Sequence, residues 1–84
     1  MLVRVESTPN PLSLKFVPEG LVSEEPMEMN SAEEANVSPL ALDLFKIDGV
    51  KKVFLGNDFI SVTINKENAW DYLKPQIIAC ISDY

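Results

Sequence analysis

The segment 38–66, which reads SPLALDLFKIDGVKKVFLGNDFISVTINK, constrains the fold more than any other part of the chain. Ser38 is a favoured helix N-cap, and Pro39 suits the first helical position, where its missing amide hydrogen costs nothing. Gly49 tolerates the left-handed conformation that ends many helices. These signals predict a helix that begins at Ser38 and ends near Ile47.

Two alternating apolar runs follow this helix, at 50–55 and 59–64. Alternation with a period of two is typical of half-buried strands, and the turn Gly56-Asn57-Asp58 is of the kind that joins antiparallel strands. The segment therefore predicts a β-hairpin with one buried face. The inward-facing residues are Val53, Leu55, Ile60, Val62 and Ile64.

The N-terminal region alternates in the same way over 2–6 and 12–17. The connection between these two runs, 7–11, contains two prolines and an asparagine, so it should form a stiff hairpin loop. In the first strand Val3 and Val5 share a face. In the second strand the inward residues are Leu12, Leu14 and Phe16.

The remaining segments complete the expected fold. Periodicity fades over 19–37, and Pro26 interrupts its one extended stretch, so we expect a loop with at most an edge strand. After residue 65 the apolar spacing becomes helical, and Pro75 inside this helix predicts either a kink or a restart near Lys74. The apolar stripe of this helix comprises Trp70, Leu73, Ile77, Cys80 and Ile81. The whole pattern predicts a two-layer α+β fold, in which two helices pack on one face of an antiparallel sheet in the order β-β-(β)-α-β-β-α.

Composition and charge exclude several classes of function. The chain has 84 residues, enough for one small domain, and no apolar run approaches the roughly 20 residues of a membrane-spanning helix. Its net charge is −6, and six of its thirteen acids lie between Pro18 and Asn36, where no base occurs. Such a segment would repel a nucleic-acid backbone, and the rest of the chain has no basic stripe. We therefore expect neither a membrane nor a nucleic acid as a partner.

Groups that carry catalysis are scarce. The chain has no histidine, so neither a Ser-His-Asp nor a Cys-His arrangement is available. Cys80, its one cysteine, lies at the margin of the apolar stripe, and one thiol falls short of the four ligands usual for an iron–sulfur cluster. Glu24, Glu25 and Glu28 offer oxygen ligands but lack the loop pattern of an EF-hand. We assign no catalytic and no metal-binding residue and expect a non-enzymatic protein.

The sheet face opposite the helices is the candidate binding surface. Strand alternation directs aromatic, basic and hydroxyl side chains to that side, and exposed aromatic and arginine side chains are favoured interface anchors. Two interpretations remain open: the face contacts a partner, or a loop such as the glutamate-rich one folds across it. The candidate residues are Arg4, Lys15, Lys52, Phe54, Phe59 and Ser61, with Ser13, Val17 and Thr63 on the same side.

Three blocks of sequence, taken in their order along the chain, are similar to a known protein family. They are VESTPNPLSLKF at 5–16, SPLALDLFKIDGVKKVFLGNDFISVT at 38–63, and the pattern of Trp70, Leu73-Lys74-Pro75 and Ile77. In this order they resemble the N-terminal domain of the Nfu/NifU-type iron–sulfur cluster scaffold proteins, over nearly the whole chain. The resemblance implies a role in iron–sulfur cluster assembly or transfer, in a bacterial cytoplasm or a mitochondrial matrix.

Proteins of this family typically join such a domain to a C-terminal one, whose CxxC motif binds a [4Fe–4S] cluster and delivers it to recipient proteins. The present sequence contains no CxxC. The resemblance therefore implies one Nfu N-terminal-like domain over residues 1–84, with no cofactor of its own. The implied partners are iron–sulfur assembly or recipient proteins and a separate CxxC domain.

Three functions remain open on the sequence. The first is a non-catalytic accessory domain of a cluster scaffold, which contributes to partner recognition or orients the cluster-binding domain. The second is a stand-alone interaction or regulatory module that holds no cluster. The third is direct cluster binding by this chain, for which Cys80 would need a dimer and external ligands.

Overall fold

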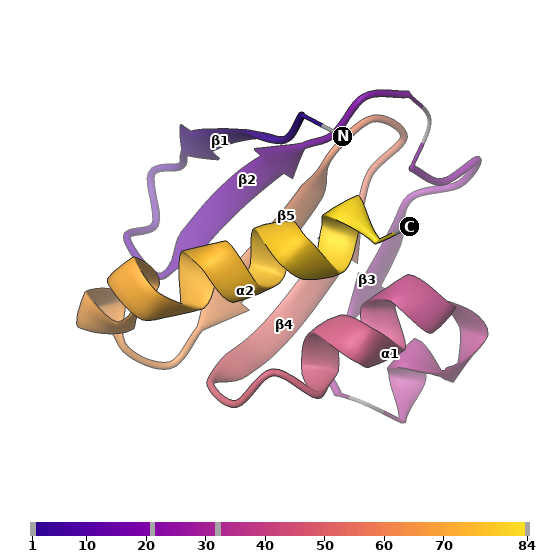
Figure 1. The fold of residues 1–84 in the computed structure, drawn as a ribbon. Helices are drawn as coiled ribbons and strands as arrows, with labels where there is room; N and C mark the ends of the chain where they lie inside the picture. The colour runs from indigo at the N-terminus through magenta and orange to yellow at the C-terminus, as the bar shows by residue number, and fades with distance from the viewer. Residues whose placement is uncertain (1, 21, 32, 84) are drawn as a thin grey trace.

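A computed structural model describes residues 2–20, 22–31 and 33–83 of the chain. Within these residues five strands form an antiparallel sheet in the order β1-β2-β5-β4-β3, and both α-helices lie on the same face of that sheet (Figure 1). This is the two-layer α+β fold that the sequence predicts. No helix of the described part is long and apolar enough to cross a membrane.

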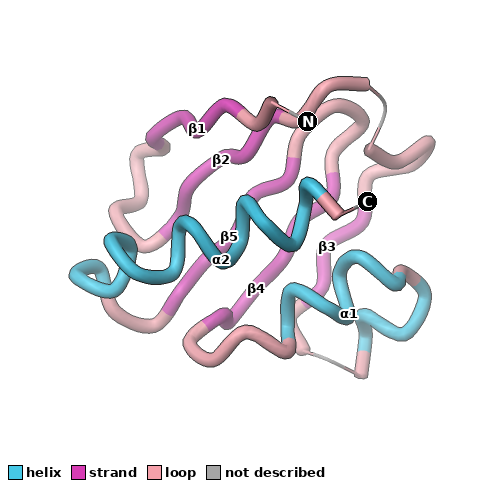
Figure 2. The backbone as a smooth tube through the Cα atoms, viewed as in Figure 1, coloured by secondary structure: helices cyan, strands magenta, loops and turns pink. Residues whose placement is uncertain are grey.

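The strands are short, and their pairing confirms both predicted hairpins. β1 pairs with β2, and β4 pairs with β5. β3 is the edge strand expected near Pro26, and it begins directly after that proline. β2 pairs with β5, which joins the N-terminal hairpin to the later one. The bounds, which can be followed in Figure 2, are Arg4–Ser7 for β1, Ser13–Val17 for β2, Met27–Met29 for β3, Val50–Leu55 for β4 and Ile60–Ile64 for β5.

Helix α1 spans Pro39–Phe45 and begins as its capping signals predict. The backbone amide of Ala41 donates to Ser38 Oγ at 3.3 Å, which satisfies one of the amides left free at a helix start. Beyond the end of α1, Gly49 has a φ of +107°, a conformation that side-chain-bearing residues rarely adopt. A short 3-10 helix at Glu34–Val37, which the sequence pattern does not predict, leads into α1.

Helix α2 spans Trp70–Ser82 and follows a 3-10 turn at Glu67–Ala69. The helix continues through Pro75, so the restart considered near Lys74 does not occur. A proline in a helix removes one backbone hydrogen bond, but packing of the apolar face supplies most of the stability of a helix in a protein. Four of the five predicted stripe residues are buried, and Cys80 at the margin is half-buried.

The core lies between the sheet and the two helices. Its buried side chains include Phe16, Val53, Leu55, Ile60, Val62 and Ile64 from the sheet and Leu44, Leu73, Ile77 and Ile81 from the helices. The Trp70 indole Nε1 donates to the Pro11 carbonyl at 3.0 Å, which attaches α2 to the β1–β2 loop. Leu12, predicted to face inward, precedes β2 and is only half-buried.

Strand β4 contains a bulge that strict alternation does not predict. Val50 pairs with Ile64 and Lys52 pairs with Thr63, so Lys51 is an extra residue between the two pairs. Regular alternation would direct Lys51 to the core, because the next alternate residues of β4 are buried. The bulge instead leaves Lys51 exposed beside Lys52.

Candidate partner-binding face

The outer face of the sheet, opposite the helices, carries the predicted binding residues. One row of outward side chains crosses all five strands and consists of Glu28, Phe54, Ser61, Lys15 and Glu6. Lys52 lies in the next row, opposite Thr63, and Arg4 lies in the row on the other side, opposite Val17. The pairing therefore brings residues that are far apart in the sequence to one face.

Phe54 and Phe59 form the apolar centre of this face. Their ring centroids are 5.8 Å apart and their planes are inclined by 23°, which is a stacked arrangement. Phe59 precedes β5 instead of beginning it, and its carbonyl accepts the Gly56 amide at 2.8 Å. The Nζ atom of Lys15 lies 4.5 Å from the centroid of the Phe59 ring, within cation–π distance. Contacts within the domain therefore orient both rings.

The glutamate-rich segment is attached beside this pair without enclosing it. The amide of Val22 donates to the Asn57 carbonyl at 2.7 Å, and Asn57 Nδ2 donates to the carbonyls of Ser23 and Glu24 at 3.1 and 3.0 Å. These bonds fix the loop to the tip of the β4–β5 hairpin. Both phenylalanines are half-buried and not covered, so part of each side chain stays open to solvent.

The basic side chains of the face differ in their partners. Glu6 lies 3.4 Å from Arg4 Nη2 and 3.9 Å from Lys15 Nζ. Exposed pairs of this kind contribute at most about 1 kcal/mol, so they orient the two bases more than they stabilise the fold. Within the described residues no acid lies at ion-pair distance from Lys52.

The hydroxyl groups of Ser13 and Thr63 bind each other on this face. Ser13 Oγ and Thr63 Oγ1 are 2.6 Å apart, a hydrogen bond between β2 and β5. Ser13 lies on the outer side, as alternation predicts, but it is only 9% exposed, so it offers little surface to a partner. A buried hydroxyl needs a partner, and Thr63 provides it.

A pocket at the β4 bulge is lined in part by residues that the sequence pattern does not predict to share a site. Its volume is about 430 Å³, and it is lined by Leu12, Asn30, Lys51, Lys52, Thr63, Ile64 and Asn65. Lys51 reaches this pocket because of the bulge described above. The one sign of this pocket in the sequence is that Lys51, a charged residue, occupies a position that alternation assigns to the core.

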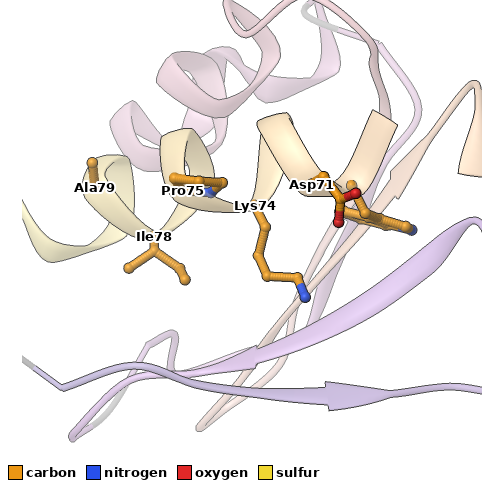
Figure 3. Close-up of a pocket in the computed structure, with 6 residues that line it drawn as sticks. Asp71, Lys74, Pro75, Ile78 and Ala79 are labelled. Carbon is orange, nitrogen blue, oxygen red and sulfur yellow. The ribbon is translucent and has the colours of Figure 1, made fainter. Parts of the chain in front are cut away.

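A groove of similar volume, about 430 Å³, runs along α2 in the helical layer. Pro75 and Ala79 are among its lining residues, and Lys74 and Ile78 extend from the helix toward the β1–β2 hairpin (Figure 3). Asp71 and Lys74 are its charged lining residues. The groove belongs to the layer opposite the outer face and adds nothing to that surface.

Cys80 is poorly suited to nucleophilic or metal chemistry. Burial raises the pKa of its thiol, and the carboxylates of Asp43 and Asp83 raise this pKa further. A thiol with a raised pKa holds little thiolate, which is the reactive and metal-binding form. Among the described residues no group of three or more histidine, cysteine, aspartate or glutamate side chains is placed to hold a metal ion.

The raised pKa of Cys80 has a measurable consequence for stability. The native state holds the thiol proton more tightly than the unfolded chain does, so the free energy of unfolding should decrease as pH rises above about 8.5. The Cys80→Ala variant should lack this part of the decrease when urea unfolding is measured from pH 7 to 10. An identical pH dependence in both proteins would show that the native environment does not shift this thiol.

Comparison with known proteins identifies the family. The model of a family described as "Scaffold protein Nfu/NifU N terminal" matches residues 3–84. NifU-like protein 4, mitochondrial, of Arabidopsis thaliana is 45% identical over 89 residues, which cover 100% of this chain and 30% of that protein. The human NFU1 iron-sulfur cluster scaffold homolog, mitochondrial, is 49% identical over 86 residues, which cover 100% of this chain and 34% of that protein. The chain thus spans about a third of the length of these relatives.

Solved structures show the same fold. The solution structure of a NifU-like protein from Saccharomyces cerevisiae matches 98% of this chain and 76% of its own, with a TM-score of 0.84 and 26% identity. The crystal structure of protein SAV1430 from Staphylococcus aureus matches 96% of this chain and 99% of its own, with a TM-score of 0.78 and 25% identity. On the family match, the sequence identity and the shared fold, this chain belongs to the Nfu/NifU scaffold protein family, whose N-terminal domain it represents.

Proposed function

We propose that this chain is a non-catalytic accessory domain of an iron–sulfur cluster scaffold and that its outer sheet face binds a protein partner. The observation that carries the proposal is the Phe54–Phe59 pair, half-exposed on a face without helices and already oriented by stacking and by Lys15. Oriented aromatic side chains lose little freedom on binding, which makes them effective interface anchors. The proposed contact residues are Arg4, Lys15, Lys52, Phe54, Phe59 and Ser61.

The cluster itself is assigned in this proposal to a separate CxxC domain. Cys80 is one thiol with a raised pKa, whereas clusters usually take four thiolates. The plant and human relatives are about three times as long as the region they share with this chain, which leaves room for such a domain. The proposed partners are that domain and iron–sulfur assembly or recipient proteins. The relatives are mitochondrial by name, and the proposed compartments for this chain are the mitochondrial matrix and the bacterial cytoplasm.

A second candidate is a stand-alone interaction module that holds no cluster. The observation in its favour is that the match covers 99% of the Staphylococcus aureus chain, so a protein of nearly this extent has been solved by itself. Both candidates use the outer face. They differ in whether this chain influences cluster delivery by a covalently joined CxxC domain.

Substitution of both aromatic residues tests the proposed face. The matched third of the human relative is replaced by this chain, the hybrid is loaded with cluster, and transfer to an apoprotein that accepts a [4Fe–4S] cluster is followed by visible circular dichroism. Phe54→Ser/Phe59→Ser should slow transfer several-fold and leave cluster loading unchanged, because the anchors are lost and the cluster domain is intact. The control is Tyr72→Ser, which removes an aromatic side chain that is 63% exposed on α2.

The same assay separates the two candidates. The comparison protein is the rest of the human relative with the matched third deleted. If it transfers clusters as fast as the complete hybrid, the accessory role is excluded and the stand-alone module remains. If the double variant transfers clusters at the unmodified rate, the outer face is not the surface that binds the partner.

A further inference from the structure

We propose that the pocket at the β4 bulge binds an acidic side chain of the protein partner, with Lys51 and Lys52 supplying the positive charge. This inference rests on the proposed function, because it specifies the chemistry of the partner that docks on the outer face. It adds a charged subsite next to the aromatic pair.

The bulge is what brings the two lysines together. In a regular strand adjacent residues point to opposite faces, so only one of Lys51 and Lys52 would reach the outer side. The register shift leaves Lys51 unpaired beside Lys52, which pairs with Thr63, and both lysines line the same pocket. Bulges commonly redirect a side chain at a binding site, at the cost of one irregular position in the sheet.

The pocket lining is suited to a carboxylate. Five of its lining residues are polar, namely Lys51, Lys52, Asn30, Asn65 and Thr63, and two are apolar, Leu12 and Ile64. No acid is among the described residues that line it. Glu34 accepts the backbone amide of Asn30 at 3.1 Å, but it does not line the pocket. In the described part of the chain neither lysine has an acid within ion-pair distance, although the chain as a whole carries a net charge of −6.

A protein-borne carboxylate fits this site better than a free anion. Both lysines are exposed, and water screens the attraction between exposed charges. Lys52 and Phe54 lie two residues apart on the same side of β4, so Lys52 of the pocket lies next to the aromatic pair. A partner that covers the aromatic pair therefore excludes water from the neighbouring lysines and strengthens their attraction to its own acidic residue.

A titration with short peptides tests the chemistry directly. The probe is hexaglutamate, added to the isotope-labelled chain and followed by NMR, with hexaglutamine as the uncharged comparison. Hexaglutamate should shift the amide signals of Lys51, Lys52, Thr63 and Asn65, and hexaglutamine should not. The Lys51→Gln/Lys52→Gln variant should bind hexaglutamate about fivefold more weakly or worse.

The matched control removes the same charge elsewhere. Lys46→Gln/Lys74→Gln should keep the affinity for hexaglutamate within about twofold, because Lys46 ends α1 and Lys74 lies in α2, in the layer opposite the outer face. Equal weakening in both double variants would overturn the proposal in favour of a general charge effect. Inorganic phosphate that shifts the same signals with equal affinity would overturn it in favour of a free-anion site.

The cluster-transfer assay distinguishes this inference from the function on which it rests. Lys51→Gln/Lys52→Gln should slow transfer by the hybrid protein, as should Phe54→Ser/Phe59→Ser. If the phenylalanine variant is slow and the lysine variant is not, the acidic subsite is wrong and the proposed face stands. If neither variant is slow, both proposals fail.

Discussion

Replacement of Ile77 by alanine is expected to lower the free energy of unfolding by about 2–5 kcal/mol. Ile77 is fully buried in the middle of α2, where it joins the helix to the sheet. The substitution removes buried methyl groups and leaves a cavity. A chain of 84 residues has a total stability of roughly 4–13 kcal/mol, at about 0.05–0.15 kcal/mol per residue, so the loss is a large fraction. Urea unfolding, followed by the fluorescence of the single tryptophan, measures it.

The matched control is Tyr72→Ala on the same helix. Tyr72 is 63% exposed, and substitutions at such positions usually change stability by less than about 0.5 kcal/mol. Both residues lie in α2, so a difference between the two variants reports burial and not helix propensity. If the variants lose equal stability, the face of α2 assigned to the core is wrong.

Local signals in the sequence were sufficient for most of the fold. The Ser38-Pro39 start and the positive-φ position at Gly49 fixed the limits of α1 to within about two residues, because caps act through neighbouring backbone groups. Alternation likewise found both hairpins, and helical spacing found the buried face of α2. These features depend on residues close together in the chain.

Features that depend on distant contacts were not predictable in the same way. The pairing of β2 with β5, the attachment of the glutamate-rich loop to Asn57 and the hydrogen bond from Trp70 to Pro11 join separate segments. The bulge at Lys51 is a mismatch between two strands, so neither strand alone encodes it visibly. Continuity of α2 through Pro75 depends on packing against the sheet, which outweighs one lost hydrogen bond.

The sequence likewise predicted the local features of the candidate site and not its contacts between strands. Alternation placed Phe54, Ser61 and Lys15 on one face, and the strand register agrees with that prediction. It did not predict the stacking of Phe54 on Phe59, the position of Lys15 over the ring or the burial of Ser13. Side-chain contacts across strands require the register, and the register is a property of the assembled sheet.

Gly56→Ala is expected to destabilise the domain by about 1–3 kcal/mol and to displace the Phe59 ring. A Cβ atom at position 56 would lie 2.4 to 2.7 Å from three ring atoms of Phe59, closer than atoms can approach. The ring has limited room to move, because it is stacked on Phe54 and lies beneath Lys15. Among the described residues Gly56 is not one of the positive-φ glycines, so the close approach of the ring is the reason for glycine here. Cluster transfer by the hybrid scaffold should slow with this variant, as is expected for Phe54→Ser/Phe59→Ser.

The cause of this destabilisation can be isolated by a double-mutant cycle with Phe59→Ser. Phe59→Ser removes the ring that a Cβ atom at position 56 would collide with. Gly56→Ala should therefore cost much less stability in the Phe59→Ser background. Urea unfolding of the single variants, the double variant and the unmodified chain gives the coupling energy. A cost that is the same in both backgrounds would attribute the effect of Gly56→Ala to the backbone. In that case the contact with Gly56 would not hold the Phe59 ring in place. The stacking on Phe54 and the contact with Lys15 would be what orients the ring.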